Sequence, residues 1–204
     1  MKNTLESQLV TGNYYNKYET KNIIEKYLMS RFFGSIANLL RGINYTNILD
    51  VGCGEGYEIN QIYYLKNCPI TGLDIGEKEI EQAKLDYPHI NFIQGSSYDL
   101  PFEDNSYDLV VSCEMLEHLD HPEQALKEIK RVSNGYVLFS VPREPLWRIL
   151  NIARGKYLSE LGNTPGHVGH WGSGSFVKFI GKHFEILDVK NPYPWTMVLG
   201  KIKE

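Results

Sequence analysis

From about residue 45 onward, short apolar runs of strand length alternate with segments whose apolar residues recur at helical spacing. This alternation predicts a parallel sheet with helices on its faces, so we expect an open α/β fold with right-handed helical crossovers between the strands. The expected strands are residues 47–51, 70–74, 90–94, 109–113 and 136–141. The expected helices that accompany them are residues 56–65, 77–87, 122–132 and 173–182.

Two further patterns flank this core. Apolar residues between Ile23 and Leu40 recur at helical spacing, which predicts a long amphipathic helix that covers the core. Near the other end, the apolar runs 184–190 and 196–202 are separated by a proline-containing link, which predicts an antiparallel hairpin at the sheet edge. No internal repeat or low-complexity linker divides the chain, so we expect a single domain over residues 1–204.

Composition narrows the class of protein. The 204 residues are 42% hydrophobic and 23% charged, which is ordinary for one globular core and argues against general disorder. The formal charge of −4 gives no support to non-specific nucleic-acid binding. Three cysteines without C-x-x-C spacing indicate free thiols. Because the first residues lack the apolar core of a signal peptide and no run reaches membrane-spanning length, we expect a cytoplasmic location.

The apolar run at residues 48–51 breaks into three alternating glycines, Gly52, Gly54 and Gly56, just before a helical pattern begins. Glycines at this point let the backbone turn sharply and approach a ligand closely. Asp50 precedes the turn, and its carboxylate repels a pyrophosphate but suits a ligand with an ammonium group. The spacing also differs from the dinucleotide fingerprint G-x-G-x-x-G, which argues against a nicotinamide-dependent oxidoreductase.

This glycine turn resembles the first motif of class I S-adenosylmethionine-dependent methyltransferases of the small-molecule type. Residues 95–102, Gly-Ser-Ser-Tyr-Asp-Leu-Pro-Phe, followed by residues 105–111, resemble a later segment of the same group. Residues 112–119 resemble the segment after strand four in ubiquinone-biosynthesis O-methyltransferases. The resemblance covers residues 45–141. It implies a doubly wound, Rossmann-like sheet of seven mostly parallel strands with a C-terminal antiparallel hairpin, and S-adenosylmethionine as the cofactor, with S-adenosylhomocysteine as its product.

The resemblance also implies which residues hold the cofactor. Asp74, at the end of the second strand, would accept from the ribose hydroxyls, with Ile75 against the adenine. Ser96 stands where the family has an aspartate that accepts from the adenine amino group, so Ser97 or Tyr98 would share that weaker contact. The expected cofactor-binding residues are Asp50, Gly52, Cys53, Gly54, Asp74, Ile75, Ser96, Ser97, Tyr98, Cys113 and Glu114.

Glu114, Glu117 and His118 follow the fourth strand at a spacing that would place them on one face of a helical turn. In one interpretation, His118 is a general base or a hydrogen-bonding group beside the methyl acceptor. In the other, the three side chains bind a divalent metal together with His167 or His170, as in the terminal 2′-O-methyltransferases of small RNAs. We assign no metal ligand from the sequence, and the second interpretation stays open.

The connection at residues 142–175 is long and rich in Trp, His and Arg, and inserts at this end of a sheet usually shape the substrate pocket. The basic residues are candidates for holding a carboxylate or phosphate, or are solvated charges; they are Arg143, Arg148, Arg154 and Lys156. The candidate catalytic residues are His118, His167 and His170. The Pro-Tyr-Pro-Trp link at residues 192–195 would add aromatic walls.

The expected single domain therefore has four parts: an N-terminal helical lid or cover (1–43), a cofactor-binding core (44–141), a substrate-side insert (142–175) and a final helix and hairpin (176–204). The aromatic segment 14–18 is interpreted as a lid over the cofactor or as a packed surface arm. We expect methyl transfer to an oxygen or nitrogen of a small aromatic or amphipathic molecule, with the oligomeric state left open. The alternatives are a metal-assisted 2′-O-methyltransferase of RNA ends and a catalytically silent S-adenosylmethionine-binding protein.

Overall fold

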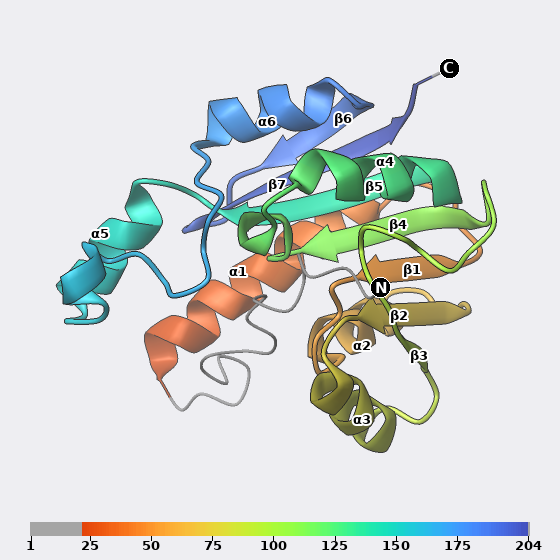
Figure 1. The fold of residues 1–204 in the computed structure, drawn as a ribbon, viewed down its shortest axis with the longest axis horizontal. Coiled ribbons are helices and arrows are strands. Elements are labelled where there is room, and N and C mark those ends of the chain that lie inside the picture. The colour runs from red at the N-terminus through yellow and green to blue at the C-terminus, as the bar shows by residue number, and fades with distance from the viewer. Residues whose placement is uncertain (1–21, 204) are drawn as a thin grey trace, which may run out of the picture.

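A computed structural model describes residues 22–203 of the chain as a seven-stranded sheet with helices on both faces (Figure 1). The expected aromatic lid segment 14–18 lies outside the described residues. The strand order is β3-β2-β1-β4-β5-β7-β6. The first five strands in this order run parallel, and β7 runs antiparallel to both β5 and β6. The predicted open sheet with a C-terminal antiparallel hairpin is confirmed.

The elements fall close to the expected positions. The strands are β1 (Ile48–Val51), β2 (Ile70–Asp74), β3 (Asn91–Gln94), β4 (Tyr107–Cys113), β5 (Ser133–Pro142), β6 (Phe184–Lys190) and β7 (Trp195–Ile202). The α-helices are α1 (Ile23–Leu40), α2 (Tyr57–Tyr63), α3 (Glu77–Asp86), α4 (Pro122–Val132), α5 (Leu146–Ala153) and α6 (Ser173–Gly181). Two short 3₁₀ turns are η1 (Leu116–His118) and η2 (Leu158–Glu160).

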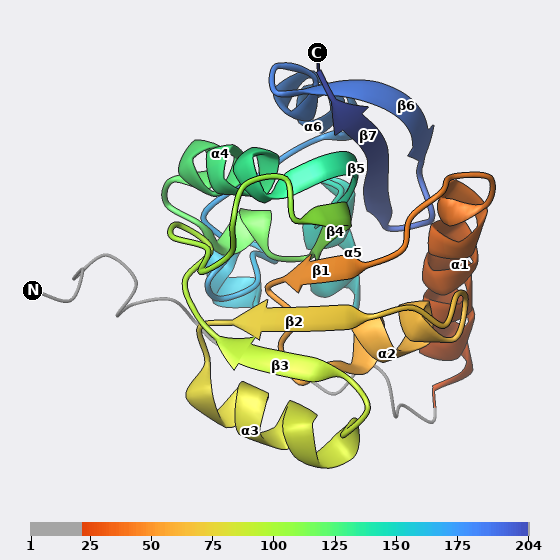
Figure 2. The ribbon, with the colours of Figure 1, turned by 90° about the vertical axis from the view of Figure 1, so that its right-hand side faces the viewer.

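Two hydrophobic layers cover the two faces of the sheet. Alternate residues of a strand point to opposite faces, so Ile48 packs in the layer that includes α1, α2 and α3, and Leu49 in the layer that includes α4 and α6. Figure 2 shows α1 and α4 on opposite sides of the central strands. The inner strands are covered on both faces, as the strands of parallel sheets usually are. Because they run parallel, their carboxyl ends all lie at one edge of the sheet.

The expectation of a helical crossover between the parallel strands is wrong for β3 and β4. The connection from β3 to β4 spans residues 95–106, all of which the structure describes, and it contains no helix. This segment instead folds back onto α4, where the guanidinium of Arg131 donates to the carbonyls of Leu100 and Phe102 at 2.8 and 2.7 Å. Glu128 accepts from the N–H of Leu100 at 2.9 Å, so polar groups of α4 satisfy the backbone that a helix would otherwise satisfy itself.

No helix within residues 22–203 has both the length and the apolar character that a membrane crossing needs.

Candidate functional site

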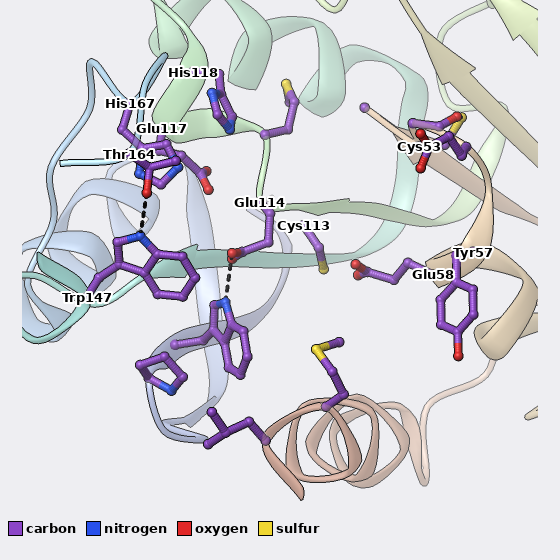
Figure 3. A pocket seen from close by; sticks show the side chains of 18 of the residues that line it. Cys53, Tyr57, Glu58, Cys113, Glu114, Glu117, His118, Trp147, Thr164 and His167 are labelled. Carbon is purple, nitrogen blue, oxygen red and sulfur yellow. Dashed lines mark hydrogen bonds between the residues drawn. The ribbon is translucent and has the colours of Figure 1, made fainter. Parts of the chain in front are cut away.

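A cavity of about 570 Å³ lies at the carboxyl ends of β1, β2 and β4, between the glycine turn and the long insert. In open α/β sheets, ligands bind in the crevice outside these strand ends. Figure 3 shows the cavity with Cys53, Tyr57 and Glu58 on one side and Glu117, His118, Trp147 and His167 on the other. The cavity thus brings the expected cofactor-binding core and the expected substrate-side insert together.

The glycine turn is held tightly. Gly52 has a φ of +84°, and a Cβ at this position would lie 2.5 Å from Cγ of Met115. The N–H of Gly54 donates to Oδ2 of Asp74 at 2.8 Å, and the N–H of Gly76 donates to Oδ1 of the same carboxylate at 2.8 Å. Asp74 thus ties the end of β2 to the turn that follows β1, and it also lines the cavity.

The core side of the cavity is acidic. Asp50, Glu58 and Asp74 line it, and Asp50 is only 3% exposed. Burial raises the pKa of the Asp50 carboxyl well above its ordinary value, and the neighbouring Glu58 and Asp74 raise it further. Burial also raises the pKa of Asp74. Three carboxylates facing one buried space favour a ligand that carries positive charge.

Cys53 and Cys113 line the same cavity, as expected. Burial is the main reason that the pKa of each thiol is well above its ordinary value, and nearby carboxylates add to the shift. Both therefore stay protonated near neutral pH and act as small apolar wall residues rather than as nucleophiles.

The expected adenine-contacting residues are split by the structure. Ile75 and Ser97 line the cavity, whereas Ser96 and Tyr98 do not. Oγ of Ser96 accepts from the N–H of Tyr98 at 3.0 Å, and the hydroxyl of Tyr98 accepts from the N–H of His121 at 3.2 Å. Ser97 is thus the expected polar residue of this segment that is placed to face a ligand.

Glu114 does not share a helical face with Glu117 and His118, so that expectation is wrong. Glu114 has a φ of +56° and precedes η1, whose three residues begin at Leu116. Its carboxylate accepts from Oγ of Ser140 at 3.1 Å. It also accepts from the indole N–H of Trp195 at 2.7 Å, the bond drawn at Glu114 in Figure 3. The left-handed backbone breaks the helical spacing, and partners distant in sequence fix the carboxylate at the cavity wall.

Glu117, His118 and His167 form a compact group on the insert side. One potential ligand atom from each lies within 4.8 Å of the others, and Glu117 is 1% exposed. The rings of His118 and His167 meet edge to face, with centroids 4.8 Å apart. Of the two histidines that the sequence left open as a partner, His167 joins this group. His170 is exposed and does not line the cavity, and its Nε2 lies 2.9 Å from Oδ1 of Asn163.

The insert forms a wall whose internal bonds the sequence did not reveal. The indole N–H of Trp147 donates to Oγ1 of Thr164 at 2.9 Å, and the amide of Asn151 donates to the same oxygen at 3.2 Å and to the carbonyl of Gly162 at 2.9 Å. The Trp147 ring is nearly parallel to that of His167, with centroids 6.3 Å apart. These contacts fold the insert back on itself, so Trp147 and Thr164 face the cavity together.

The four basic residues of the insert fall into two groups, one at the cavity and one away from it. Arg154 and Lys156 line the cavity, whereas Arg143 and Arg148 do not. Arg148 donates to the carbonyls of Leu161 and Glu160 at 3.1 and 3.3 Å, which is a role within the insert. Arg154 donates to Oδ1 of Asn151 at 2.6 Å and lies 3.9 Å from Glu25 of α1.

Several lining residues were not anticipated as site residues. Glu58, in the first turn of α2, is 8% exposed, and its place two residues after the last glycine of the turn is the sequence signal that could have identified it. Three further lining residues are identified as site residues only by contacts across the insert: Trp147, Asn151 and Thr164.

Comparisons with known proteins give a consistent family. Residues 49–139 match the family model described as a methyltransferase domain. An O-methyltransferase of Aspergillus nomiae is 34% identical over 125 residues, which are 58% of this chain and 55% of that protein. A ubiquinone biosynthesis O-methyltransferase of Nitrosomonas europaea is 28% identical over 138 residues, 62% of this chain and 57% of that protein. This chain therefore spans little more than half the length of these relatives.

Solved structures match the fold over most of the chain. A protein of Pyrococcus horikoshii has a TM-score of 0.69 at 18% identity, and the match covers 93% of this chain and 97% of that one. The magnesium protoporphyrin IX methyltransferase of Synechocystis, solved with bound S-adenosylhomocysteine, has a TM-score of 0.66 at 16% identity and covers 90% and 89%. These likenesses support the fold.

Proposed function

We infer that this chain, which carries a class I S-adenosylmethionine-dependent methyltransferase domain over residues 49–139, transfers a methyl group to an oxygen or nitrogen of a small molecule. The family match confirms the resemblance drawn from the motifs. One observation carries the proposed reaction: a single cavity joins the acidic glycine turn to the histidines and aromatic rings of the insert. Donor and acceptor can therefore meet within one shared space.

The residues present fit the cofactor. Gly52 has a positive φ and a Cβ there would meet Met115, so only glycine fits this position and the turn keeps the sharp shape that forms one wall of the cavity. The carboxylates of Asp50, Glu58 and Asp74 complement a molecule with an ammonium and a sulfonium group. When bound, S-adenosylmethionine supplies the electrophilic methyl group on its sulfonium sulfur.

The chain's own residues would orient the reactants and exclude water. Asp50 would face the amino-acid end of the cofactor, and Asp74, Ile75 and Ser97, which also line the cavity, would contact the nucleoside as the resemblance implies. On the other side, the group of Glu117, His118 and His167 would accept the proton that leaves the acceptor. Nδ1 of His118 lies 3.1 Å from the carbonyl of Gly166, so this nitrogen carries the proton of the neutral ring and Nε2 carries the lone pair.

We infer the acceptor class from the aromatic and basic residues that line the cavity. Trp147, Tyr193 and Trp195 line the cavity and suit an aromatic or amphipathic molecule. Arg154 and Lys156 line it as well and would attract an acceptor that carries a carboxylate or phosphate. A small acceptor is favoured over nucleic acid because the chain has a net charge of −4.

The test has two steps. Isothermal titration with S-adenosylmethionine should show one site per chain, and radiolabelled methyl transfer to a panel of phenols, catechols, amines and aromatic acids should identify an acceptor. The panel also includes a short RNA end, because the group formed by Glu117, His118 and His167 is the one on which the metal-assisted RNA methyltransferase alternative depends. Absence of cofactor binding would overturn the proposal. Binding without transfer to any acceptor would favour the catalytically silent alternative.

A further inference from the structure

We propose that Glu117, His118 and His167 bind one divalent cation of the zinc class. One carboxylate and two imidazoles are a donor set that suits borderline metals such as Zn²⁺ and Co²⁺. Their potential ligand atoms all lie within 4.8 Å of one another. In a tetrahedral zinc site with metal–ligand distances of about 2.1 Å, ligand atoms are about 3.4 Å apart. The three side chains would have to rotate to bring their ligand atoms to that spacing.

The supporting contacts are those that orient metal-binding histidines. A ligating imidazole typically donates its second ring N–H to a backbone carbonyl, which fixes the tautomer and the ring orientation. His118 has this arrangement, since its Nδ1 lies 3.1 Å from the carbonyl of Gly166, and Nε2 would be the nitrogen that binds the metal. The side-chain amide of Asn163 donates to the carbonyl of His167 at 3.2 Å and restrains the backbone that carries the second imidazole.

The loop and the turn that supply the three side chains are bonded to each other. The carbonyl of Glu117 accepts from the N–H groups of Val168 and Gly169 at 2.9 and 2.8 Å. Gly169 permits this approach, because a Cβ there would lie 3.2 Å from Cα of Glu117 and 2.6 Å from the ring of Trp171. His167 is thereby held beside a turn that is 50 residues earlier in the sequence.

Burial makes a cation favourable here. The Glu117 carboxylate is 1% exposed and His167 is 8% exposed, and an ionised carboxylate at such depth is stable only beside a cation or a proton donor. A protonated imidazole within the group would satisfy Glu117 as an ion pair. A divalent cation between the three side chains would complement the Glu117 carboxylate and leave both rings neutral.

The site also faces the reaction space. Glu117, His118 and His167 all line the cavity, so three protein ligands leave open coordination positions toward a bound molecule. A cation there would bind the acceptor oxygen and lower its pKa, so that the hydroxyl releases its proton to water and the two histidines serve as ligands in place of the proton acceptor; this points to a hydroxyl acceptor and O-methylation. This last step rests on the proposed methyl transfer, whereas metal binding does not.

The experiment measures metal binding by the complete chain without substrate. Protein stripped with a chelator is titrated with Co²⁺, followed by visible absorption, and with Zn²⁺ by isothermal titration. We expect one equivalent of metal per chain. The substitutions Glu117→Gln, His118→Gln and His167→Gln should each weaken binding by at least about 100-fold, beyond the 10–100-fold typical of supporting contacts. His170→Gln, three residues from His167 and exposed, is the matched control and should bind like the wild type.

Circular dichroism and S-adenosylmethionine titration verify that each variant is folded. If Glu117→Gln fails to fold because its site is buried, the wild-type stoichiometry and the loop variant His167→Gln carry the test. Less than one equivalent in the wild type, or an equal loss in His167→Gln and His170→Gln, overturns the metal site. Protein that binds S-adenosylmethionine but no metal overturns this inference alone, and protein that binds metal but no S-adenosylmethionine overturns the proposed function alone.

Discussion

The carboxylate of Asp74 accepts a hydrogen bond from the backbone N–H of Gly54 at 2.8 Å, across 20 residues of sequence. The same carboxylate holds the N–H of Gly76 with its other oxygen. Asp74 is therefore the link that sets the end of β2 against the glycine turn, in addition to its expected contact with the ribose. A residue that positions the turn and faces the ligand should affect cofactor affinity through both roles.

Asp74→Asn is expected to raise the dissociation constant for S-adenosylmethionine at least tenfold, or about 1.4 kcal/mol, since hydrogen bonds to charged groups contribute roughly 1.5–3 kcal/mol. An amide offers one acceptor oxygen where the carboxylate offers two. Isothermal titration measures the effect, and Asp86→Asn, an exposed change at the end of α3, is the control for lost charge. Equal affinities of the two variants would refute the linking role.

Gly52→Ala should destabilise the protein and abolish cofactor binding. The φ of +84° costs a non-glycine residue about 1–2 kcal/mol, and the added Cβ would lie 2.5 Å from Cγ of Met115, which must move. A loss of about 2–3 kcal/mol lowers the Tm by roughly 5–10 °C for a chain of this size. Gly34→Ala is the control, because Gly34 is an exposed position of α1 and no atom lies within 4 Å of the new Cβ. This change should leave stability unchanged or raise it by up to about 1 kcal/mol. Similar Tm values for both variants would contradict this account.

Local signals explain why much of the fold was predictable. The expected strand 70–74 and helix 122–132 have the bounds found for β2 and α4, because each apolar pattern is delimited by a strong local feature. Asp74 and Gly76 end the strand, and Pro122 begins the helix. The glycine turn was recognisable for the same reason, since its glycines and Asp50 are neighbours in sequence.

The insert side of the site depends on contacts that no local pattern carries. Glu114 finds Trp195, which is 81 residues away, and His118 lies beside Gly166, which is 48 residues away. The i, i+3, i+4 spacing presupposed a helix, but the left-handed backbone of Glu114 removes it from the set that Glu117 and His118 form with His167. The sequence predicted that Glu117 and His118 could meet His167 or His170, but it could not choose between the two histidines or exclude Glu114.

Asp50→Asn should make the protein more stable and bind cofactor less tightly. Burial beside Glu58 and Asp74 raises the folded-state pKa of Asp50 well above its ordinary value of 3.8. A raised folded pKa means that the carboxyl costs stability once pH exceeds 3.8, increasingly so up to the folded pKa, and costs nothing below 3.8, where both states are protonated. The amide removes this cost but also the negative charge that would face an ammonium group.

Urea unfolding of wild type and Asp50→Asn at about pH 8 and about pH 4 tests the sign. The variant should have the higher midpoint at the higher pH, and the two midpoints should converge at the lower pH. Its dissociation constant for S-adenosylmethionine should rise about tenfold or more. A variant that is less stable than wild type at the higher pH would show that the buried carboxylate contributes to the fold instead of opposing it.

Asp108 should show the opposite dependence on pH. Its Oδ2 accepts from the hydroxyl and the N–H of Thr46 at 2.5 and 2.6 Å, and these bonds, the hydroxyl foremost, lower its pKa below 3.8. A depressed folded pKa stabilises the protein above 3.8, and the contribution is lost as pH falls through the folded value. Asp108→Asn should cost about 1 kcal/mol near pH 7, a value kept low because the pair is accessible to solvent. The difference from wild type should shrink below about pH 3.8. Urea unfolding of Thr46→Val, Asp108→Asn and the double variant gives a double-mutant cycle for this pair. A coupling energy near pH 7 that disappears in acid supports the hydrogen-bonded link between Thr46 and Asp108. Strictly additive losses of stability at both pH values would disprove it.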